Sequence, residues 1–326
     1  MYLYLCQLIL GGKYMHSNLF SPLIDSLFKV PQALYNIIYK LPNYIEYQLP
    51  NKETRIGDIS IPIGVTRTDK LYLNIGQRNV HTLVTGMSGY GKSNLLNSII
   101  CSITQLYPNT ELMLYDFKAV EFSQYCNMRN VVEYQYISDN ISTALDNLYQ
   151  TILNRYEQML SNNKRCISIY DKRTVVIIDE ISLCNRKHDI PILEKCMAIS
   201  RACGIHFILA TQRASANDVL SPIIRNLLDT VITFKLDINT SKLTLGTEEA
   251  SLLDKVGRGI FKLSDRNIEF QSYFISKDTI DTVIKDNIKV INTSSNCKVA
   301  IENTEYKTPN DNINVTDVNK NWVEEL

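Results

Sequence analysis

One stretch of the sequence, Gly86 to Ser93, restricts the fold more than any other, and it reads GMSGYGKS. It fits the pattern G-x-x-x-x-G-K-[S/T], in which glycines allow successive backbone N–H groups to turn toward one point and cradle phosphate oxygens. In this pattern Lys92 is placed to reach the terminal phosphates and Ser93 to hold Mg²⁺. The predicted phosphate-binding residues are Gly86, Met87, Ser88, Gly89, Tyr90, Gly91, Lys92, Ser93 and Asn94.

The residues on either side of this glycine-rich loop support the assignment. Residues 79–85, NVHTLVT, are apolar and β-branched, as in a buried strand. After the loop, apolar residues recur at helical spacing: Leu95, Leu96, Ile99, Ile100 and Ile103. A strand, a glycine-rich loop and a helix in this order are the context of a P-loop, and the positive end of the helix adds to the same anion site. The alternative is a glycine turn with an incidental lysine.

The composition is that of an ordinary soluble globular protein, with 326 residues of which 45% are apolar and 21% charged. Lys plus Arg and Asp plus Glu both number 34, so net charge does not indicate a nucleic-acid partner. The eight cysteines form no C-x-x-C pair and the four histidines are scattered, which predicts no zinc site and favours a reducing, cytoplasmic setting. No run approaches the roughly 20 apolar residues of a membrane helix.

The two ends of the sequence differ from its middle. Residues 1–54 are apolar, tyrosine-rich and interrupted by prolines, which predicts short helices. Within them, Met1 to Leu10 is either a core or interface segment or a weak membrane contact. Residues 277–326 are rich in Asn, Thr, Asp and Glu, and we expect a disordered tail in which Trp322 is either a partner anchor or an isolated aromatic.

The middle of the chain predicts an α/β fold. Residues 55–77 contain two alternating segments that predict strands leading into the nucleotide-binding part, residues 78–276. There, near-continuous apolar strands alternate with helices, which predicts a mostly parallel sheet covered by helices on both faces, with an antiparallel edge. The predicted strands are residues 79–85, 111–116, 174–179, 205–210, 231–236, 259–263 and 268–275, and the predicted helices are residues 141–160 and 191–202.

Two strand ends carry the residue types of nucleotide hydrolysis. Residues 174–179 form an apolar strand that ends in Asp179, followed by Glu180; such an Asp can hold Mg²⁺, and the Glu can orient and deprotonate the attacking water. The alternative is an acidic turn in which Asp179 caps a helix. The strand at 205–210 leads to Gln212, which would contact the attacking water or the terminal phosphate as a sensor, or simply cap the strand.

Residues 59–276 resemble the FtsK/SpoIIIE DNA translocases, a RecA-like branch of P-loop motors. The motifs that carry the resemblance are Asp116, Lys118 and Glu121 as D-x-K-x-x-E, Asn154-Arg155-Tyr156 at a helix end, Ser200 to His206 leading into Ala210 to Ser215, and a closing segment from Leu245 to Phe261. There are departures: Ala214 replaces the usual Pro, no Arg stands near Asp229 and Thr230, and Lys242 stands where many relatives have Arg.

The resemblance implies an ATPase that uses ATP and Mg²⁺ to move double-stranded DNA, working as a homo-hexameric ring in which a neighbour's arginine completes each site. The candidates for that arginine are Arg201, Arg225 and Arg213, and the candidate channel walls are the loops at 120–130 and 213–226. The compact form resembles motors of conjugative plasmids, integrative elements and phages, with a relaxase or membrane transfer complex as partner and a cytoplasmic or peripheral membrane location. The alternatives are an ATPase that moves protein, as in type VII secretion, and a nucleotide-dependent adaptor without catalysis.

Overall fold

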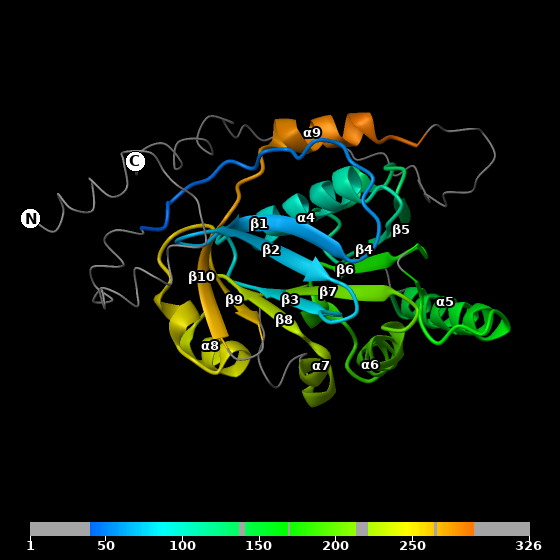
Figure 1. The fold of residues 1–326 in the computed structure, drawn as a ribbon. Coiled ribbons are helices and arrows are strands. Elements are labelled where there is room, and N and C mark those ends of the chain that lie inside the picture. Colours follow the sequence, from blue (N-terminus) through cyan, green and yellow to red (C-terminus); the bar gives the residue numbers. More distant parts are fainter. Residues whose placement is uncertain (1–39, 137–140, 169, 213–220, 264–265, 290–326) are drawn as a thin grey trace, which may run out of the picture. The chain divides into compact units, whose positions relative to one another are not determined.

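A ten-stranded sheet runs through the computed structural model, in the order β2-β1-β10-β9-β8-β3-β7-β6-β4-β5 (Figure 1). The structure describes residues 40–136, 141–168, 170–212, 221–263 and 266–289. Most of the N-terminal segment for which we predict short helices therefore lies outside the described residues, as do Trp322 and most of the predicted tail. Within the described part, no helix has both the length and the apolarity needed to cross a membrane.

One end of the sheet is parallel. Its strands are β8 (Thr230–Thr233), β3 (Thr82–Thr85), β7 (Ile205–Thr211), β6 (Thr174–Ile178), β4 (Glu111–Asp116) and β5 (Val131–Tyr136). Every residue of β3, β6 and β7 is buried, as expected for apolar strands with helices on both sides. Because parallel strands end at the same edge, the loops that follow β3, β4, β6 and β7 meet there.

The other end of the sheet is antiparallel. It consists of β1 (Ile59–Val65), β2 (Lys70–Ile75), β9 (Arg258–Leu263) and β10 (Arg266–Ser272). β9 pairs with β8 and so continues the parallel part, while β2 forms the outer edge and alternates between exposed and buried residues. The two strands predicted within residues 55–77 therefore exist, and they join the same sheet beyond β10.

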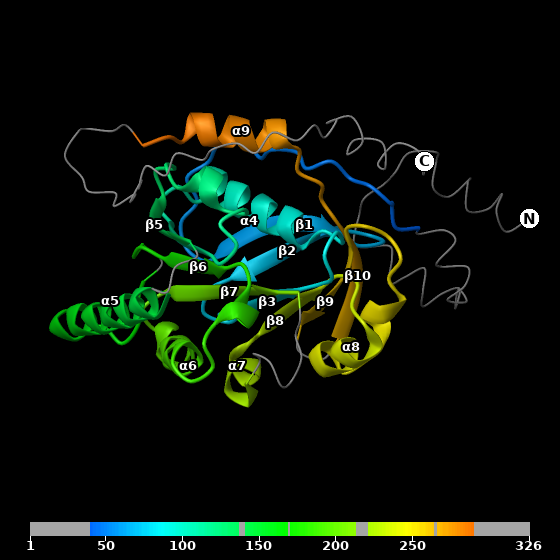
Figure 2. The same ribbon diagram turned by 180° about the vertical axis from the view of Figure 1, so that it is seen from behind.

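Helices cover both faces of the sheet, as Figures 1 and 2 show. α4 (Lys92–Leu106) and α9 (Lys277–Asp286) lie on one face, and α5 (Ile141–Ser161), α6 (Asp189–Ser200) and α7 (Pro222–Leu227) lie on the other. Each face has its own hydrophobic cluster, and a smaller cluster lies beside α8 (Ile238–Leu245). This arrangement confirms the predicted α/β class with a sheet covered on both faces.

The predicted boundary of the disordered tail at residue 277 is wrong. Residues 277–286 form α9, which begins after the N-cap residue Ser276. Ile280 and Val283 are 6% and 0% exposed, and they belong to the same hydrophobic cluster as the apolar face of α4. The polar composition that suggests disorder belongs to the solvent-facing side of an amphipathic helix, and the apolar residues that would have revealed this helix are few.

Candidate nucleotide-binding site

The glycine-rich loop connects β3 to α4 and has the backbone shape that its glycines allow. Gly89 and Gly91 have φ values of +84° and +110°, a region that residues with a Cβ rarely adopt. At Gly91 a Cβ would also lie 3.2 Å from the Cα of Gly257, so a larger residue would be crowded as well as strained. The N–H of Met87 donates to the carbonyl of Lys235 at 2.9 Å, which fastens the loop to the end of β8.

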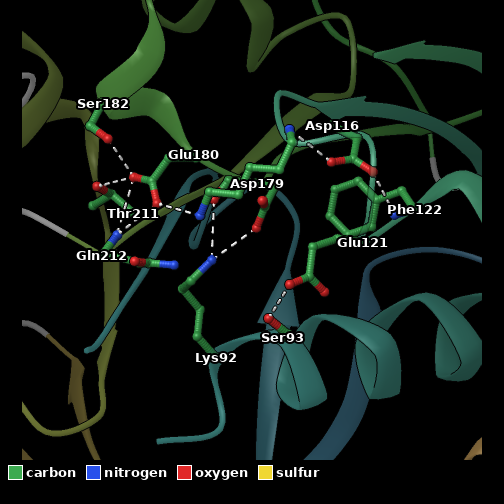
Figure 3. A network of polar contacts seen from close by, with 11 residues as sticks. Lys92, Ser93, Asp116, Glu121, Phe122, Asp179, Glu180, Ser182, Thr211 and Gln212 are labelled. Atoms are coloured by element: carbon green, nitrogen blue, oxygen red, sulfur yellow. Dashed lines mark hydrogen bonds and ion pairs between the residues drawn. The ribbon is translucent and has the colours of Figure 1, made fainter. Parts of the chain in front are cut away.

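Lys92 and Asp179 meet at the edge of the sheet where the parallel strands end. The ammonium of Lys92 donates to Oδ1 of Asp179 at 2.8 Å and to its backbone carbonyl at 3.3 Å (Figure 3). Lys92 is 5% exposed and Asp179 is fully buried. The hypothesis of a single nucleotide site required this meeting, because the two residues come from the loops after β3 and β6.

Glu180 lies beside Asp179 but has different surroundings. Its carboxylate accepts hydrogen bonds from the hydroxyls of Ser182 at 2.6 Å and Thr211 at 2.7 Å, and it pairs with the ammonium of Lys118 at 3.2 Å. Burial raises the pKa of the Glu180 carboxyl, but these hydrogen bonds, the N–H of Gln212 and the charge of Lys118 outweigh it and hold the pKa below its ordinary value. The carboxylate is therefore ionised and fixed in direction.

Gln212 reaches Glu180 through its backbone. Its N–H lies 3.1 Å from Oε1 and 3.2 Å from Oε2 of Glu180. The predicted sensor role of the Gln212 side chain stays a prediction, but the contact shows that the end of β7 is joined to the carboxylate after β6. Thr211 is a part of this site that the sequence does not predict; the only signal for it is its position at a strand end beside Gln212.

Asn94, the last residue of the predicted phosphate-binding set, has its side chain engaged elsewhere. Its amide nitrogen donates to the carbonyl of Ile275 at 3.1 Å, and its amide oxygen accepts from the N–H of Ile275 at 3.2 Å. These bonds tie the start of α4 to the segment after β10. A contact between Asn94 and a nucleotide would therefore use its backbone N–H.

Two further residues of the site come from the loop after β4. Glu121 accepts a hydrogen bond from the hydroxyl of Ser93 at 2.6 Å (Figure 3). Lys118 pairs with Glu180 as described above. Both belong to the D-x-K-x-x-E motif, but the motif alone predicts no role for either of them. Their partners lie 28 and 62 residues away along the chain, so local sequence could not have paired them.

The arginine candidates lie away from this cluster. Arg201 precedes β7 and Arg225 precedes β8, so both are at the amino-terminal ends of the parallel strands, opposite the glycine-rich loop. Neither can complete the site of its own chain from there. Their role toward a neighbouring subunit stays a prediction, and Arg213 lies outside the described residues.

The donors at this site fit Mg²⁺. Oδ2 of Asp179 is buried and has no hydrogen-bond partner among the described residues, although Oδ1 of the same carboxylate is bonded to Lys92. A buried oxygen of this kind costs free energy unless a partner arrives. Ser93 is the second residue of α4 and adds a hydroxyl oxygen to the site. Hydroxyl, carboxylate and phosphate oxygens are the ligands that Mg²⁺ prefers.

A family model described as "FtsK/SpoIIIE family" matches residues 48–184. The DNA translocase FtsK of Lactococcus lactis is 30% identical over 254 residues, which cover 69% of this chain and 33% of that protein. The DNA translocase FtsK of Helicobacter pylori is 26% identical over 282 residues, covering 78% of this chain and 32% of that protein. The chain thus spans about a third of the length of these curated relatives.

Solved structures share the fold. The pCW3 conjugation coupling protein TcpA, in a monomer form with ATPγS, superposes with a TM-score of 0.63 at 22% identity, covering 76% of this chain and 75% of that one. Two ATPase domains of EssC from Geobacillus thermodenitrificans superpose with a TM-score of 0.64 at 16% identity, covering 76% of this chain and 50% of that one. These neighbours are P-loop ATPases, and their fold is the one described above.

Proposed function

The chain belongs to the FtsK/SpoIIIE family, and on that premise we propose that it is an ATP-driven motor that moves double-stranded DNA during plasmid or mobile-element transfer. The observation that carries the ATPase part is the meeting of Lys92 with Asp179 beside the ionised carboxylate of Glu180. These three side chains, with Ser93, provide the charges and the base that phosphoryl transfer to water requires.

The residues divide the reaction between them. The backbone N–H groups of the glycine-rich loop and Lys92 bind the terminal phosphates of ATP. Ser93 and Asp179 would hold Mg²⁺, which, when bound, neutralises charge on the phosphate oxygens. Glu180 orients a water molecule and takes its proton as the water oxygen bonds to the γ-phosphorus; the bond from that phosphorus to the ADP oxygen breaks, and ADP leaves with the electron pair.

The DNA part of the proposal rests on the relatives. Both curated relatives are named DNA translocases, and TcpA is named a conjugation coupling protein. We propose a ring of six copies in which Arg201 or Arg225 of one subunit reaches the site of the next. A position at the edge of the sheet opposite the chain's own glycine-rich loop is compatible with an arginine that acts on a neighbouring subunit.

The deciding experiment is the ATPase rate of the full chain with and without duplex DNA of unrelated sequences. We expect DNA to stimulate hydrolysis irrespective of sequence, and Lys92→Ala to remove the stimulated and the basal rate. Lys195→Ala, on the exposed side of α6, is the matched control and should behave as wild type. Particle imaging with DNA should show rings.

Any other result would favour one of the two alternative functions. A hydrolysis rate that DNA does not change contradicts the translocase. It favours the protein-moving alternative, because the type VII secretion ATPase EccC of Thermomonospora curvata shares this fold with a TM-score of 0.62. ATP binding without turnover favours the adaptor without catalysis.

A further inference from the structure

The loop from Asp116 to Phe122 joins the two halves of the nucleotide site. We propose that Glu121 and Lys118 are positioning residues, Glu121 for the metal-holding hydroxyl of Ser93 and Lys118 for the carboxylate of Glu180. This inference rests on the proposed function, since it assigns roles within the same site. It adds Glu121, Lys118 and the loop that carries them to the proposed site.

The loop is fixed at both ends. Phe117 is 9% exposed and belongs to the hydrophobic cluster on the α5 face of the sheet, whereas Phe122 is fully buried in the cluster on the α4 face. The carboxylate of Asp116 accepts from the N–H of Lys118 at 3.2 Å and from the N–H of Phe122 at 2.8 Å. The loop therefore straddles the end of β4 and is closed from within by one buried side chain.

The backbone between these anchors is strained. Ala119 has a φ of +55°, which lies in the left-handed region that residues with a Cβ rarely adopt. Strain of this kind persists where surrounding contacts determine the conformation, and it gathers at functional sites. Here it accompanies a turn that directs Lys118 toward Glu180 and Glu121 toward Ser93.

Glu121 provides what a metal-holding hydroxyl needs. When the oxygen of Ser93 faces a cation, its hydrogen must point to another acceptor, and Oε1 of Glu121 lies 2.6 Å away. Partners of this kind orient metal ligands, and their removal typically lowers metal affinity about 10- to 100-fold. The carboxylate also adds negative charge close to the cation.

Lys118 acts on the other half. Its ammonium lies 3.2 Å from Oε2 of Glu180, while Ser182 and Thr211 donate to Oε1 of the same carboxylate. Lys118 is thus the side-chain donor to Oε2, where the backbone N–H of Gln212, which also lies near Oε1, approaches within 3.2 Å. A displaced base loses part of the roughly 10²- to 10⁴-fold that a positioned one contributes.

The experiment on Glu121 measures binding of ATPγS to the full chain as Mg²⁺ is titrated, with variants Glu121→Ala, Glu121→Gln and, as matched control, Glu157→Ala. Glu157 is an exposed glutamate on α5. We expect Glu121→Ala to need about 10-fold more Mg²⁺ for half-maximal binding, with unchanged affinity in EDTA. Glu121→Gln keeps an acceptor oxygen and should lie between Glu121→Ala and wild type. Equal Mg²⁺ dependence in all four proteins, or equal loss in EDTA, overturns the role of Glu121.

The experiment on Lys118 separates kcat from KM. We expect Lys118→Met to lower kcat about 10-fold with KM within about 3-fold, and Lys118→Arg to recover part of the loss. An unchanged kcat, or a parallel loss in Lys118→Arg with an altered melting temperature, overturns the role of Lys118. If the wild-type chain binds Mg·ATPγS but does not hydrolyse ATP, the proposed function fails, and the Glu121 measurement still decides the positioning of Ser93.

Discussion

Asp179 and Glu180 are adjacent carboxylates for which we propose different tasks, and their environments differ accordingly. Asp179 is fully buried, with one oxygen on Lys92 and the other without a partner among the described residues. Glu180 has both oxygens engaged by donors from its own loop, from the loop after β4 and from the end of β7. The first arrangement suits a cation, and the second suits a carboxylate that must keep a fixed direction.

A substitution of Asp179 tests this division. Asp179→Asn keeps the size of the side chain and an oxygen for Lys92, but it removes the charge that a cation would meet. We expect nucleotide binding in EDTA to stay within a few-fold of wild type, while hydrolysis falls by at least about 100-fold, the upper range for loss of even an outer partner of a metal ligand. Asp146→Asn, on the exposed side of α5, is the control in the same assays. Unchanged hydrolysis would place the metal elsewhere.

Two buried histidines predict how stability changes with pH. His81 and His206 are 2% and 1% exposed, and burial lowers the pKa of each from 6.5 to about 4. Nδ1 of His81 accepts from the N–H of Phe207, so Nε2 carries the proton and donates to the carbonyl of Met197. Protonation of His81 at Nδ1 would break the first of these bonds.

The sign follows from the lowered pKa values. Between pH 6.5 and about 4 the two histidines are protonated in the unfolded chain but neutral in the folded chain. The free energy of unfolding is therefore unaffected by them above pH 6.5 and decreases as pH falls toward 4. Each shift corresponds to roughly 3 kcal/mol. Urea midpoints measured between pH 7.5 and 5 should fall, and they should fall less in His206→Gln, which lacks one of the two buried rings. A flat profile over this range would contradict the assignment.

Among single residues, those in the motifs were predictable from the sequence, whereas the contacts that they make with other loops were not. The glycine-rich loop, Lys92 and Asp179 follow from local pattern, because each motif is contiguous and its strand is strongly apolar. The contacts of Glu121 and Thr211 depend on which loops meet at the edge of the sheet, and that is a property of strand order.

Among the elements, α5 shows how a single side chain can fasten a helix to several strands. Arg155 donates to the carbonyl of Cys203 at 3.1 Å, to Glu111 at 3.0 Å and to the hydroxyl of Thr174 at 2.6 Å. These partners stand at the starts of β7, β4 and β6. The Asn154-Arg155-Tyr156 motif is therefore a structural one, far from the nucleotide site.

Removal of this link should be costly. We expect Arg155→Met to lower the free energy of unfolding by about 2–3 kcal/mol, because hydrogen bonds to a charged group contribute about 1.5–3 kcal/mol and the side chain is 19% exposed. Lys164→Met breaks an exposed pair with Asp171 and should cost less than about 1 kcal/mol. Urea unfolding of the three proteins measures both values. Equal losses in the two variants would show that Arg155 is only a surface charge.

Elements with strong periodicity were predicted closely, and short ones were missed. The predicted helix at 141–160 is α5, Ile141–Ser161, and the predicted strand at 111–116 is β4. β5, α7 and α8 were not predicted. β5 is an edge strand with the polar residues Glu133 and Gln135, and α7 and α8 contain 6 and 8 residues, too few for a helical period to be distinct.

Over the whole molecule, the sheet order could not have been read from the sequence. β1 and β2 precede β3 in the chain, yet β10, β9 and β8 lie between them and β3 in the sheet. Their position depends on the antiparallel pairing of β1 with β10, and these two strands are about 200 residues apart. The C-terminal strands β9 and β10 thus connect the N-terminal strands β1 and β2 to the rest of the sheet.

The C-terminal end of the folded part is α9, and truncation tests whether this helix contributes to stability. Deleting residues 277–326 removes α9 and exposes the apolar face of α4 that Ile280 and Val283 cover. Two buried aliphatic side chains contribute about 1.5–3 kcal/mol each, so we expect the free energy of unfolding to fall by about 3 kcal/mol or more. Deleting only residues 290–326 should leave it within about 0.5 kcal/mol, because α9 and its packing in the hydrophobic cluster with α4 are retained. Urea unfolding of the full chain and both truncations compares them directly. If the two truncated proteins are equally stable, α9 does not contribute to the stability of the fold, and residue 276 is the end of its stabilising part.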